Sequence, residues 1–236
     1  MQSDFNNTIC ALSKIYGIVP ENEDLFRKAL THGSYTKENN LSTLQNYERL
    51  EFLGDAVLKL CVSGILCKLY PNYSEGDMSR IRSTVVSDNI LSRIAVNINL
   101  SKYLILGEQE EKNGGRVRSS ILACTFEALL GAYYLEGKFK ELSVFLEEKM
   151  LPIIKEVDEN QLKFNAKAVL QEYTQGLTKE LPEYKLIKED GPAHDRVFIV
   201  EVSYGGTVLA SEKGKTKKEA EQNCAYLACE KLGIGK

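Results

Sequence analysis

The chain has 236 residues, of which 43% are hydrophobic and 27% charged, and its formal net charge is −3. This length and apolar content predict a soluble globular protein with one large domain or two smaller ones. No apolar run approaches the eighteen residues of a membrane span, and residues 1–7 lack the basic and apolar regions of a signal peptide. We therefore expect a cytoplasmic protein without a membrane partner.

The cysteines show no metal-binding or disulfide pattern. None of them forms a Cys-x-x-Cys pair, and they are scattered through apolar, helix-like segments rather than short loops. Buried free thiols are the expected state of all six, which are Cys10, Cys61, Cys67, Cys124, Cys224 and Cys229.

Residues up to about Leu151 predict an all-α domain. Apolar residues recur there at spacings of three and four, and no stretch alternates convincingly with a period of two. Glycine, proline and polar segments mark the breaks between helices. The expected helices are Asp4–Tyr16, Asn22–Leu30, Tyr47–Leu69, Ser74–Ile98, Ser119–Leu135 and Lys138–Met150.

The helix expected at Tyr47–Leu69 carries three acids on one face. At 100° per residue, Glu48, Glu51 and Asp55 fall within an arc of about 60°. Three carboxylates so placed repel one another unless a cation lies between them, and hard oxygen ligands suit Mg²⁺. An exposed acidic face on an ordinary amphipathic helix is the alternative. The apolar stripe is expected opposite the acids, at Leu50, Leu53, Val57 and Leu60.

Residues 48–55, Glu-Arg-Leu-Glu-Phe-Leu-Gly-Asp, resemble the signature of the ribonuclease III family, endonucleases that use Mg²⁺ to cut double-stranded RNA. The resemblance implies Mg²⁺ as the cofactor, with Mn²⁺ as a substitute. The segment Tyr73–Arg82 also resembles the family, and Glu75 lies where its members keep a carboxylate near the metal. An acid that stabilises a helix N-terminus would explain Glu75 equally well.

A second acidic position lies in the helix expected at Ser119–Leu135. Glu127 shares a face with the small residues Ala123, Cys124 and Gly131, so another helix can pack closely there. This segment resembles the family's second acidic motif, in which an aspartate and a glutamate three residues apart complete the metal site.

The aspartate position of that motif is Cys124 in this chain. Thiolate is a soft ligand and Mg²⁺ a hard cation, so Cys124 is a poor metal ligand here, and a water would take the place of the lost oxygen. Two interpretations stay open: a nuclease with weakened metal affinity, and a catalytically impaired protein that only binds double-stranded RNA.

Phe52 lies on the edge of the acid face, where a monomer has no use for a large apolar side chain. In the family this aromatic residue enters a socket on a second subunit, so the resemblance implies a homodimer.

The C-terminal part predicts a small α-β-β-β-α domain. A helix at Ala166–Gly176 precedes strands at Tyr184–Lys188, Val197–Tyr204 and Thr207–Ala210, and Thr216 opens a last helix with Glu219 as its capping-box partner. With Gly191–His194 and Gly214–Glu221, this order resembles a double-stranded RNA-binding domain. We expect domains at 1–153 and 164–233, joined by a polar linker at 154–163.

RNA contacts follow from that second resemblance. Four lysines gather at the start of the last helix, where the macrodipole disfavours them unless they bind phosphate; a run of lysines exposed to solvent is the alternative. Gln171 and His194 match the family's minor-groove contacts. The lysines are Lys213, Lys215, Lys217 and Lys218, and the last three are expected to bind RNA.

Together the two halves predict a Mg²⁺-dependent endoribonuclease that cuts double-stranded RNA during processing of rRNA and other structured transcripts. By the resemblance, its products carry 5′-phosphate and 3′-hydroxyl ends. Glu51 and Glu127 are the preferred metal ligands, Asp55 positions the attacking water or serves as a ligand, and Glu48 lies nearby. A helical metal enzyme acting on small phosphoesters would leave the lysine cluster unexplained, so we expect no small-molecule substrate.

Overall fold

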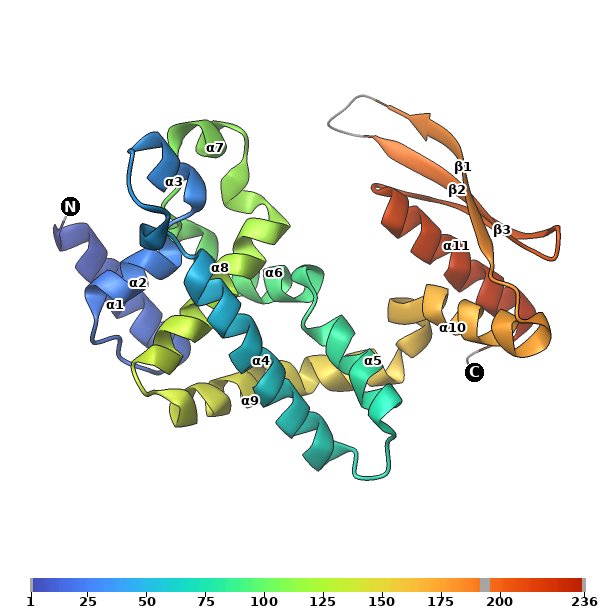
Figure 1. Cartoon of the computed structure of the whole chain (residues 1–236), viewed down its shortest axis with the longest axis horizontal. Helices are drawn as coiled ribbons and strands as arrows, with labels where there is room; N and C mark the ends of the chain where they lie inside the picture. Colours follow the sequence, from blue (N-terminus) through green and yellow to red (C-terminus); the bar gives the residue numbers. More distant parts are fainter. Residues whose placement is uncertain (1, 192–195, 235–236) are drawn as a thin grey trace. The chain divides into compact units, whose positions relative to one another are not determined.

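The computed structural model describes residues 2–191 and 196–234 and divides the chain into two compact units, Met1–Lys155 and Glu156–Lys236. The first unit is helical and the second combines helices with one three-stranded sheet (Figure 1). The predicted fold classes are therefore confirmed. In the part of the chain that is described, no helix is both long and apolar enough to cross a membrane.

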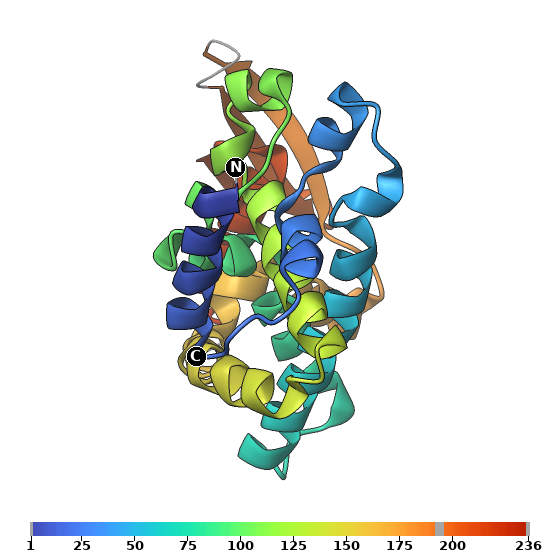
Figure 2. The same cartoon turned by 90° about the vertical axis from the view of Figure 1, so that its left-hand side faces the viewer.

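Helix α8 forms the centre of the first unit. It is buried on nearly all sides, as expected for a helix with so few polar residues. Helices α2, α4 and α6 pack against it, and α4 crosses it at close range (Figures 1 and 2). The helices of this unit are α1 (Gln2–Tyr16), α2 (Glu23–Leu30), α3 (Gly33–Glu38), α4 (Glu48–Leu69), α5 (Glu75–Val85), α6 (Asp88–Asn97), α7 (Glu108–Lys112), α8 (Ser119–Leu135) and most of α9 (Phe139–Glu159), whose last four residues belong to the second unit.

The helix predicted at Ser74–Ile98 is two helices, α5 and α6. The break falls at Val86–Ser87, where Ser87 leaves the helical conformation with φ −73° and ψ 151° and becomes the N-cap of α6. The sequence signal for this break, a serine followed by an acid at a helix start, lies in Ser87-Asp88.

The helix predicted to end at Met150 is longer, because α9 continues through Pro152 to Glu159. A proline inside a helix removes one backbone hydrogen bond and strains the turn before it. Here a continuous buried stripe on both sides of the proline offsets that cost. The stripe consists of Leu142, Leu146, Met150, Ile154 and Val157, each fully buried.

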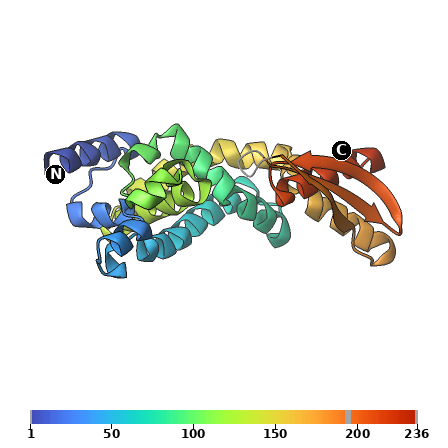
Figure 3. The same ribbon diagram turned by 90° about the horizontal axis from the view of Figure 1, so that it is seen from above.

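The second unit contains helices α10 (Gln161–Thr178) and α11 (Lys217–Leu232) and an antiparallel sheet of β1 (Glu183–Asp190), β2 (Val197–Tyr204) and β3 (Thr207–Gly214), in that order (Figure 3). The β2–β3 turn uses Gly205 and Gly206 at φ 56° and 75°, as the predicted tight hairpin requires. Helix α11 packs against β2 and β3 and against α10. The core between them includes Ala166, Leu170, Val202, Ala210, Cys224 and Ala228.

The cap of α11 differs in one detail from the prediction. The Thr216 side chain accepts a hydrogen bond from the Glu219 backbone N–H, at 3.1 Å, as a capping box requires. The Glu219 carboxylate, however, accepts from the N–H of Lys215, one residue before the cap. This bond holds the lysine-rich turn against the start of the helix.

All six cysteines are free thiols, as predicted. Cys61, Cys224 and Cys229 are buried and Cys124 is half-buried, whereas Cys10 and Cys67 are exposed, contrary to the expectation that all would be buried. Cys224 lies in the core of the second unit, where its thiol donates to the carbonyl oxygens of Val200 and Ala210 at 3.2 Å.

Candidate functional site

The two acid-bearing helices cross at a pair of glycines. A Cβ atom placed on Gly54 of α4 would lie 1.7 Å from the carbonyl oxygen of Glu127, and one on Gly131 of α8 would lie 2.2 Å from the carbonyl oxygen of Leu50. Only glycine allows this approach of the two backbones. Because Gly54 adjoins Asp55 and follows Glu51 by less than one turn, the crossing brings the acids of α4 next to Glu127.

Glu127 is the electrostatic centre of this crossing. Burial and, less strongly, the charges of Asp55, Glu51 and Asp88 together raise its pKa to about 8, while Lys59 opposes the increase. Asp55 itself pairs with Lys59 at 2.7 Å. Glu127 therefore lies among several acids with one nearby cation, and that cation is already paired with Asp55.

Glu51 and Cys124 form a hydrogen-bonded pair across the crossing. Burial, together with the Glu51 charge and the hydrogen bond to Glu51, raises the pKa of the Cys124 thiol to about 12. The thiol therefore stays protonated at neutral pH and donates to the Glu51 carboxylate. The Tyr47 hydroxyl also hydrogen-bonds Cys124, and burial raises the pKa of Tyr47 well above its usual range.

The other predicted acids lie at different distances from this centre. Glu48 is exposed at the start of α4, and its charge raises the pKa of Glu51 without acting appreciably on Glu127. Glu75 is the first residue of α5 and accepts a hydrogen bond from the Ser79 hydroxyl at 2.6 Å. It is not among the principal charges acting on Glu51, Cys124 or Glu127.

Two residues at this crossing were not predicted from the sequence. Tyr47 lies directly before α4, and Asp88 is the first residue of α6. The charge of Asp88 acts on Glu51, Cys124 and Glu127. The Ser87-Asp88 helix start could have located the second of these acids. The proximity of Asp88 to α8 depends on tertiary packing, which the sequence pattern does not show.

The carboxylates fit a hard divalent cation in charge and in donor type. Glu51, Asp55 and Glu127 offer oxygen donors whose mutual repulsion such an ion would relieve, whereas the protonated Cys124 thiol offers none. As the side chains stand, no three His, Cys, Asp or Glu residues in 2–191 and 196–234 converge closely enough to hold a metal. Loading would require Asp55 to turn away from Lys59.

Phe52 and Leu60 form part of an exposed apolar row on α4. Phe52 is 82% exposed and Leu60 60% exposed, and Ala56 between them is exposed too. The prediction that Leu60 belongs to the buried stripe is wrong, because the buried face of α4 contains Leu50, Val57 and Leu58 and leaves Leu60 outside it. Residues spaced by four form a ridge suited to packing against another helix.

The lysine cluster of the second unit lies on its surface. Lys213, Lys215, Lys217 and Lys218 are all exposed around the start of α11. The Lys217 ammonium pairs with Glu189 at 2.9 Å and lies 5.6 Å from the centre of the Phe198 ring. Lys218 has no ion pair among the described residues.

Of the two residues predicted to contact the minor groove, only Gln171 lies in the described part of the chain. Gln171 is exposed on α10, free to contact a ligand. His194 lies outside the described residues.

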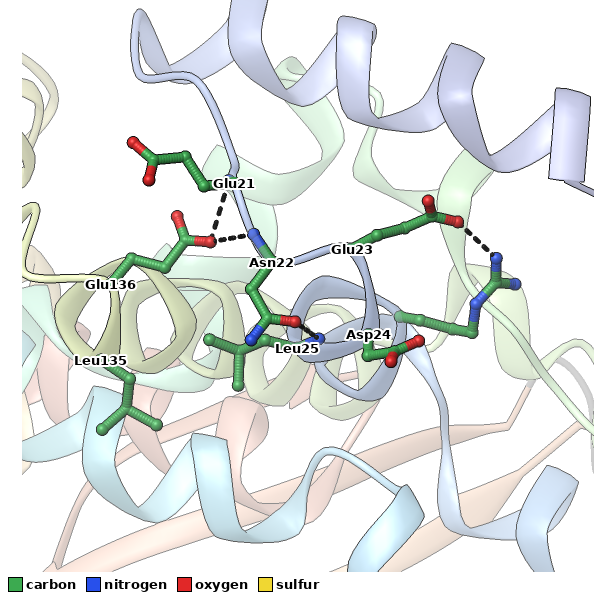
Figure 4. Close-up of a pocket in the computed structure, with 8 residues that line it drawn as sticks. Glu21, Asn22, Glu23, Asp24, Leu25, Leu135 and Glu136 are labelled. Carbon is green, nitrogen blue, oxygen red and sulfur yellow. Dashed lines mark hydrogen bonds and ion pairs between the residues drawn. The ribbon is translucent and has the colours of Figure 1, made fainter.

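A pocket at the far end of α8 is separate from this site. It is lined by residues of the α2 start and by Leu135 and Glu136, eight and nine residues beyond Glu127 along α8 and the turn that follows (Figure 4). The Glu136 carboxylate accepts from the backbone N–H groups of Glu21 and Asn22, which ties α8 to the loop before α2. This pocket is therefore a structural junction.

Comparison with known proteins places both units. Residues 22–154 match the family described as Ribonuclease-III-like, and residues 166–232 match the double-stranded RNA binding motif. The chain is 40% identical over 232 residues to Ribonuclease 3 of Pelotomaculum thermopropionicum, covering 98% of this chain and 96% of that relative. It is 45% identical over 213 residues to Ribonuclease 3 of Borreliella burgdorferi, covering 88% and 84%.

A solved structure also resembles the first unit. It is the nuclease domain of ribonuclease III from Campylobacter jejuni, described for structural flexibility in a region involved in dimer formation. The TM-score is 0.53 at 34% identity, over 62% of this chain and 95% of that one. On these matches the chain belongs to the ribonuclease III family, as an endoribonuclease of that type with a double-stranded RNA-binding domain.

Proposed function

We propose that the protein is a Mg²⁺-dependent, homodimeric endoribonuclease that cleaves double-stranded RNA, with Mn²⁺ as an alternative cofactor. The observation that carries the proposal is the Gly54–Gly131 crossing, which brings the helices that bear Glu51, Asp55 and Glu127 into close backbone contact. Such an accumulation of carboxylates destabilises the protein unless a cation binds there.

Each of these side chains has a proposed role. Glu51 and Glu127 hold the cation from the two helices, and Asp55, released from Lys59, orients the attacking water or completes the ligand set. When bound, the cation supplies activation of water and stabilises charge on the leaving oxygen. Cys124 and Tyr47 keep Glu51 in position through their hydrogen bonds. Glu48 adds negative charge next to this set.

The second unit supplies RNA affinity. Lys215, Lys217 and Lys218 contact phosphates, and Gln171 reaches the minor groove of an A-form duplex. The match to the double-stranded RNA binding motif and the exposed lysines support this role. The proposed products carry 5′-phosphate and 3′-hydroxyl ends, and the proposed substrates are rRNA precursors and other structured transcripts.

The exposed row on α4 is the proposed dimer contact. Phe52, at 82% exposure, would be covered by a second copy of the chain, and the Campylobacter jejuni relative is described with a dimer-forming region in its nuclease domain. We expect Phe52→Ser to shift sedimentation from dimer to monomer, while Val144→Ser, a comparably exposed apolar position on α9, leaves the dimer intact. A Phe52→Ser protein that stays dimeric would exclude this contact.

The decisive experiment compares cleavage of a long RNA duplex in Mg²⁺ and in Mn²⁺ by three proteins: the chain itself, Glu127→Ala and Cys124→Asp. We expect the chain to cut, Glu127→Ala to lose more than about a hundredfold in rate, and Cys124→Asp to cut at lower metal concentration. Duplex binding, measured in EDTA, should be equal in all three.

Cys124 also supports a second candidate function. If the duplex is bound by all three proteins but cut only by Cys124→Asp, the chain is a double-stranded RNA-binding protein with an impaired nuclease site. The protonated Cys124 thiol, which cannot serve as an oxygen ligand, is the observation behind this alternative.

A further inference from the structure

One lysine of the cluster at the start of α11 is held by an acid. The Lys217 ammonium lies 2.9 Å from Oε1 of Glu189, near the end of β1. The same carboxylate holds a second cation, since Nη1 of Arg196 lies 3.4 Å from Oε2. Glu189 therefore binds two cations from different parts of the second unit, one at each of its oxygens.

The contact forms on the face of the sheet that α11 covers. Glu189 lies opposite Phe198 in the β1–β2 register, and the Lys217 ammonium lies 5.6 Å from the centre of the Phe198 ring. The carboxylate and the ring together direct the Lys217 side chain toward β1. The side chains of Lys217 and Glu189 are still 57% and 36% exposed, so a ligand from solution can reach both.

A carboxylate with a cation at each oxygen has the charge and the partners that an RNA phosphate would have. Carboxylate and phosphate oxygens accept the same charge-assisted hydrogen bonds from lysine and arginine. A phosphate that approaches Lys217 must either displace Glu189 or bind beside a negative charge, and both oppose binding. The hydrogen bond from Lys217 lowers the pKa of Glu189, so the carboxylate stays ionised at neutral pH.

We propose that Glu189 is an internal competitor for RNA phosphate: its carboxylate pairs with Lys217 and Arg196 in the free protein and is displaced when a duplex binds. The competition weakens duplex binding and favours release of cut products, a step that limits the turnover of many enzymes. This inference rests on the proposed function, because it concerns the proposed phosphate contact of Lys217.

A surface ion pair without any role is the competing explanation, since many such pairs contribute nothing measurable. Asp190 provides a matched case. It follows Glu189 on β1 and pairs with Lys188 at 2.7 Å, with side chains 63% and 58% exposed. Adjacent strand residues point to opposite faces of a sheet, so this second pair lies on the face away from α11. Removal of the Asp190 charge changes the net charge equally but leaves Lys217 paired.

The test measures binding of an RNA duplex to the full-length chain in EDTA, by fluorescence anisotropy over a range of salt concentrations. Glu189→Gln keeps a side-chain oxygen that accepts from Lys217 but removes the charge. We expect it to tighten duplex binding about two- to fivefold, the equivalent of one surface ion pair. The slope of log affinity against log salt should steepen by up to about 0.9, because the Lys217 charge becomes available to a phosphate.

Asp190→Asn should bind the duplex nearly as the parent does. Equal affinities of Glu189→Gln and Asp190→Asn would overturn the proposal, because the effect would then be one of net charge alone. Weaker binding by Glu189→Gln than by the parent would overturn it too, since the carboxylate would then hold Lys217 in position for RNA instead of competing with it.

Lys217→Ala tests which cation the competition concerns. Without the ammonium, removal of the Glu189 charge releases no lysine, so adding Glu189→Gln to Lys217→Ala should tighten binding less than it does in the parent. Such non-additivity is expected of two groups in direct contact. A gain of the same size in both backgrounds would refute competition for Lys217.

The parent protein separates this inference from the proposed function. If the parent binds the duplex and Glu189→Gln binds no more tightly, the RNA contact stands and the role of Glu189 is refuted. If the parent binds no duplex, the RNA contact of the second unit is wrong and the competition is refuted with it. Circular dichroism melting of each variant verifies that the second unit is folded.

Discussion

The two charged regions of this protein handle charge in opposite ways. At the crossing of α4 and α8, acids gather in a partly buried space where burial and mutual repulsion raise the pKa of Glu127 to about 8. At the start of α11, the lysines are exposed, and the pairing of Lys217 lowers the pKa of Glu189 while leaving both groups at the surface. The first region is strained without a partner, and the second is not.

The difference matches the size of the proposed ligands. A small cation is held best by few groups that are already close together and partly desolvated. A nucleic-acid backbone is long and highly charged, so exposed lysines bind it through many weak, salt-sensitive contacts. Changes at the first region should therefore act sharply, and changes at the second gradually.

The largest effect is expected from Gly131→Ala. The new methyl group would lie 2.2 Å from the Leu50 carbonyl oxygen, so α4 and α8 must separate. Overpacking of this kind costs about 1–3 kcal/mol of unfolding free energy, and displacement of the acids by about 1 Å costs roughly a hundredfold in cleavage rate. Urea denaturation and duplex cleavage measure the two effects.

Gly64→Ala is the control for that change. Gly64 lies on α4 as well, but a methyl group there meets nothing within 4 Å. Alanine in place of an exposed helical glycine stabilises by about 0.5–1 kcal/mol. If Gly64→Ala and Gly131→Ala had similar effects on unfolding, the close crossing would not be what fixes the acids.

A smaller effect is expected from Lys218→Ala. Loss of one phosphate contact lowers the slope of log affinity against log salt by about 0.9, which corresponds to roughly fivefold weaker duplex binding at 0.15 M salt. Lys231→Ala removes the same charge from the other end of α11, where the ammonium donates to the Leu209 carbonyl oxygen. When duplex affinity is measured between 0.05 and 0.3 M salt, Lys231→Ala should keep the salt slope of the unchanged chain. If the unchanged chain, Lys218→Ala and Lys231→Ala all had the same slope, Lys218 would not contact the RNA.

The smallest effect concerns pH and the stability of the metal-free protein. The folded state holds a proton on Glu127 up to about pH 8, whereas the unfolded chain releases it near 4.5. Stability is therefore lost as the pH rises through this window. Compared with Glu127→Gln, the chain in EDTA should melt at progressively lower temperature from pH 5 to pH 8.5, by about 2–4 °C for each kcal/mol of unfolding free energy that is lost. If the melting temperatures of the chain and of Glu127→Gln changed equally with pH, the raised pKa of Glu127 would be contradicted.

Sequence patterns predicted the helices that form this site better than they predicted which residues lie in it. Helix α8 was predicted with its observed bounds, because its apolar residues and the glycine face are both local features. Leu60 was assigned to the buried face because periodicity cannot show which of two apolar rows on α4 faces α8. Tyr47 and Asp88 were missed because their relation to Cys124 arises only when three separate helices pack together.

The uninterrupted course of α9 also bears on proteolysis. Helix α9 ends at Glu159 and α10 begins at Gln161, but the backbone leaves the helical conformation again at Asn165, with φ −131° and ψ 28°. Lys155 therefore lies inside a helix, whereas Lys163 lies in a single turn between Asn160 and Asn165. Proteases cut exposed loops readily, but they cut a helix only after it unwinds locally. Trypsin should therefore leave the bond after Lys155 intact under conditions that would cleave an ordinary interdomain loop, and the turn at Lys163 should be the first site cut near the boundary between the units.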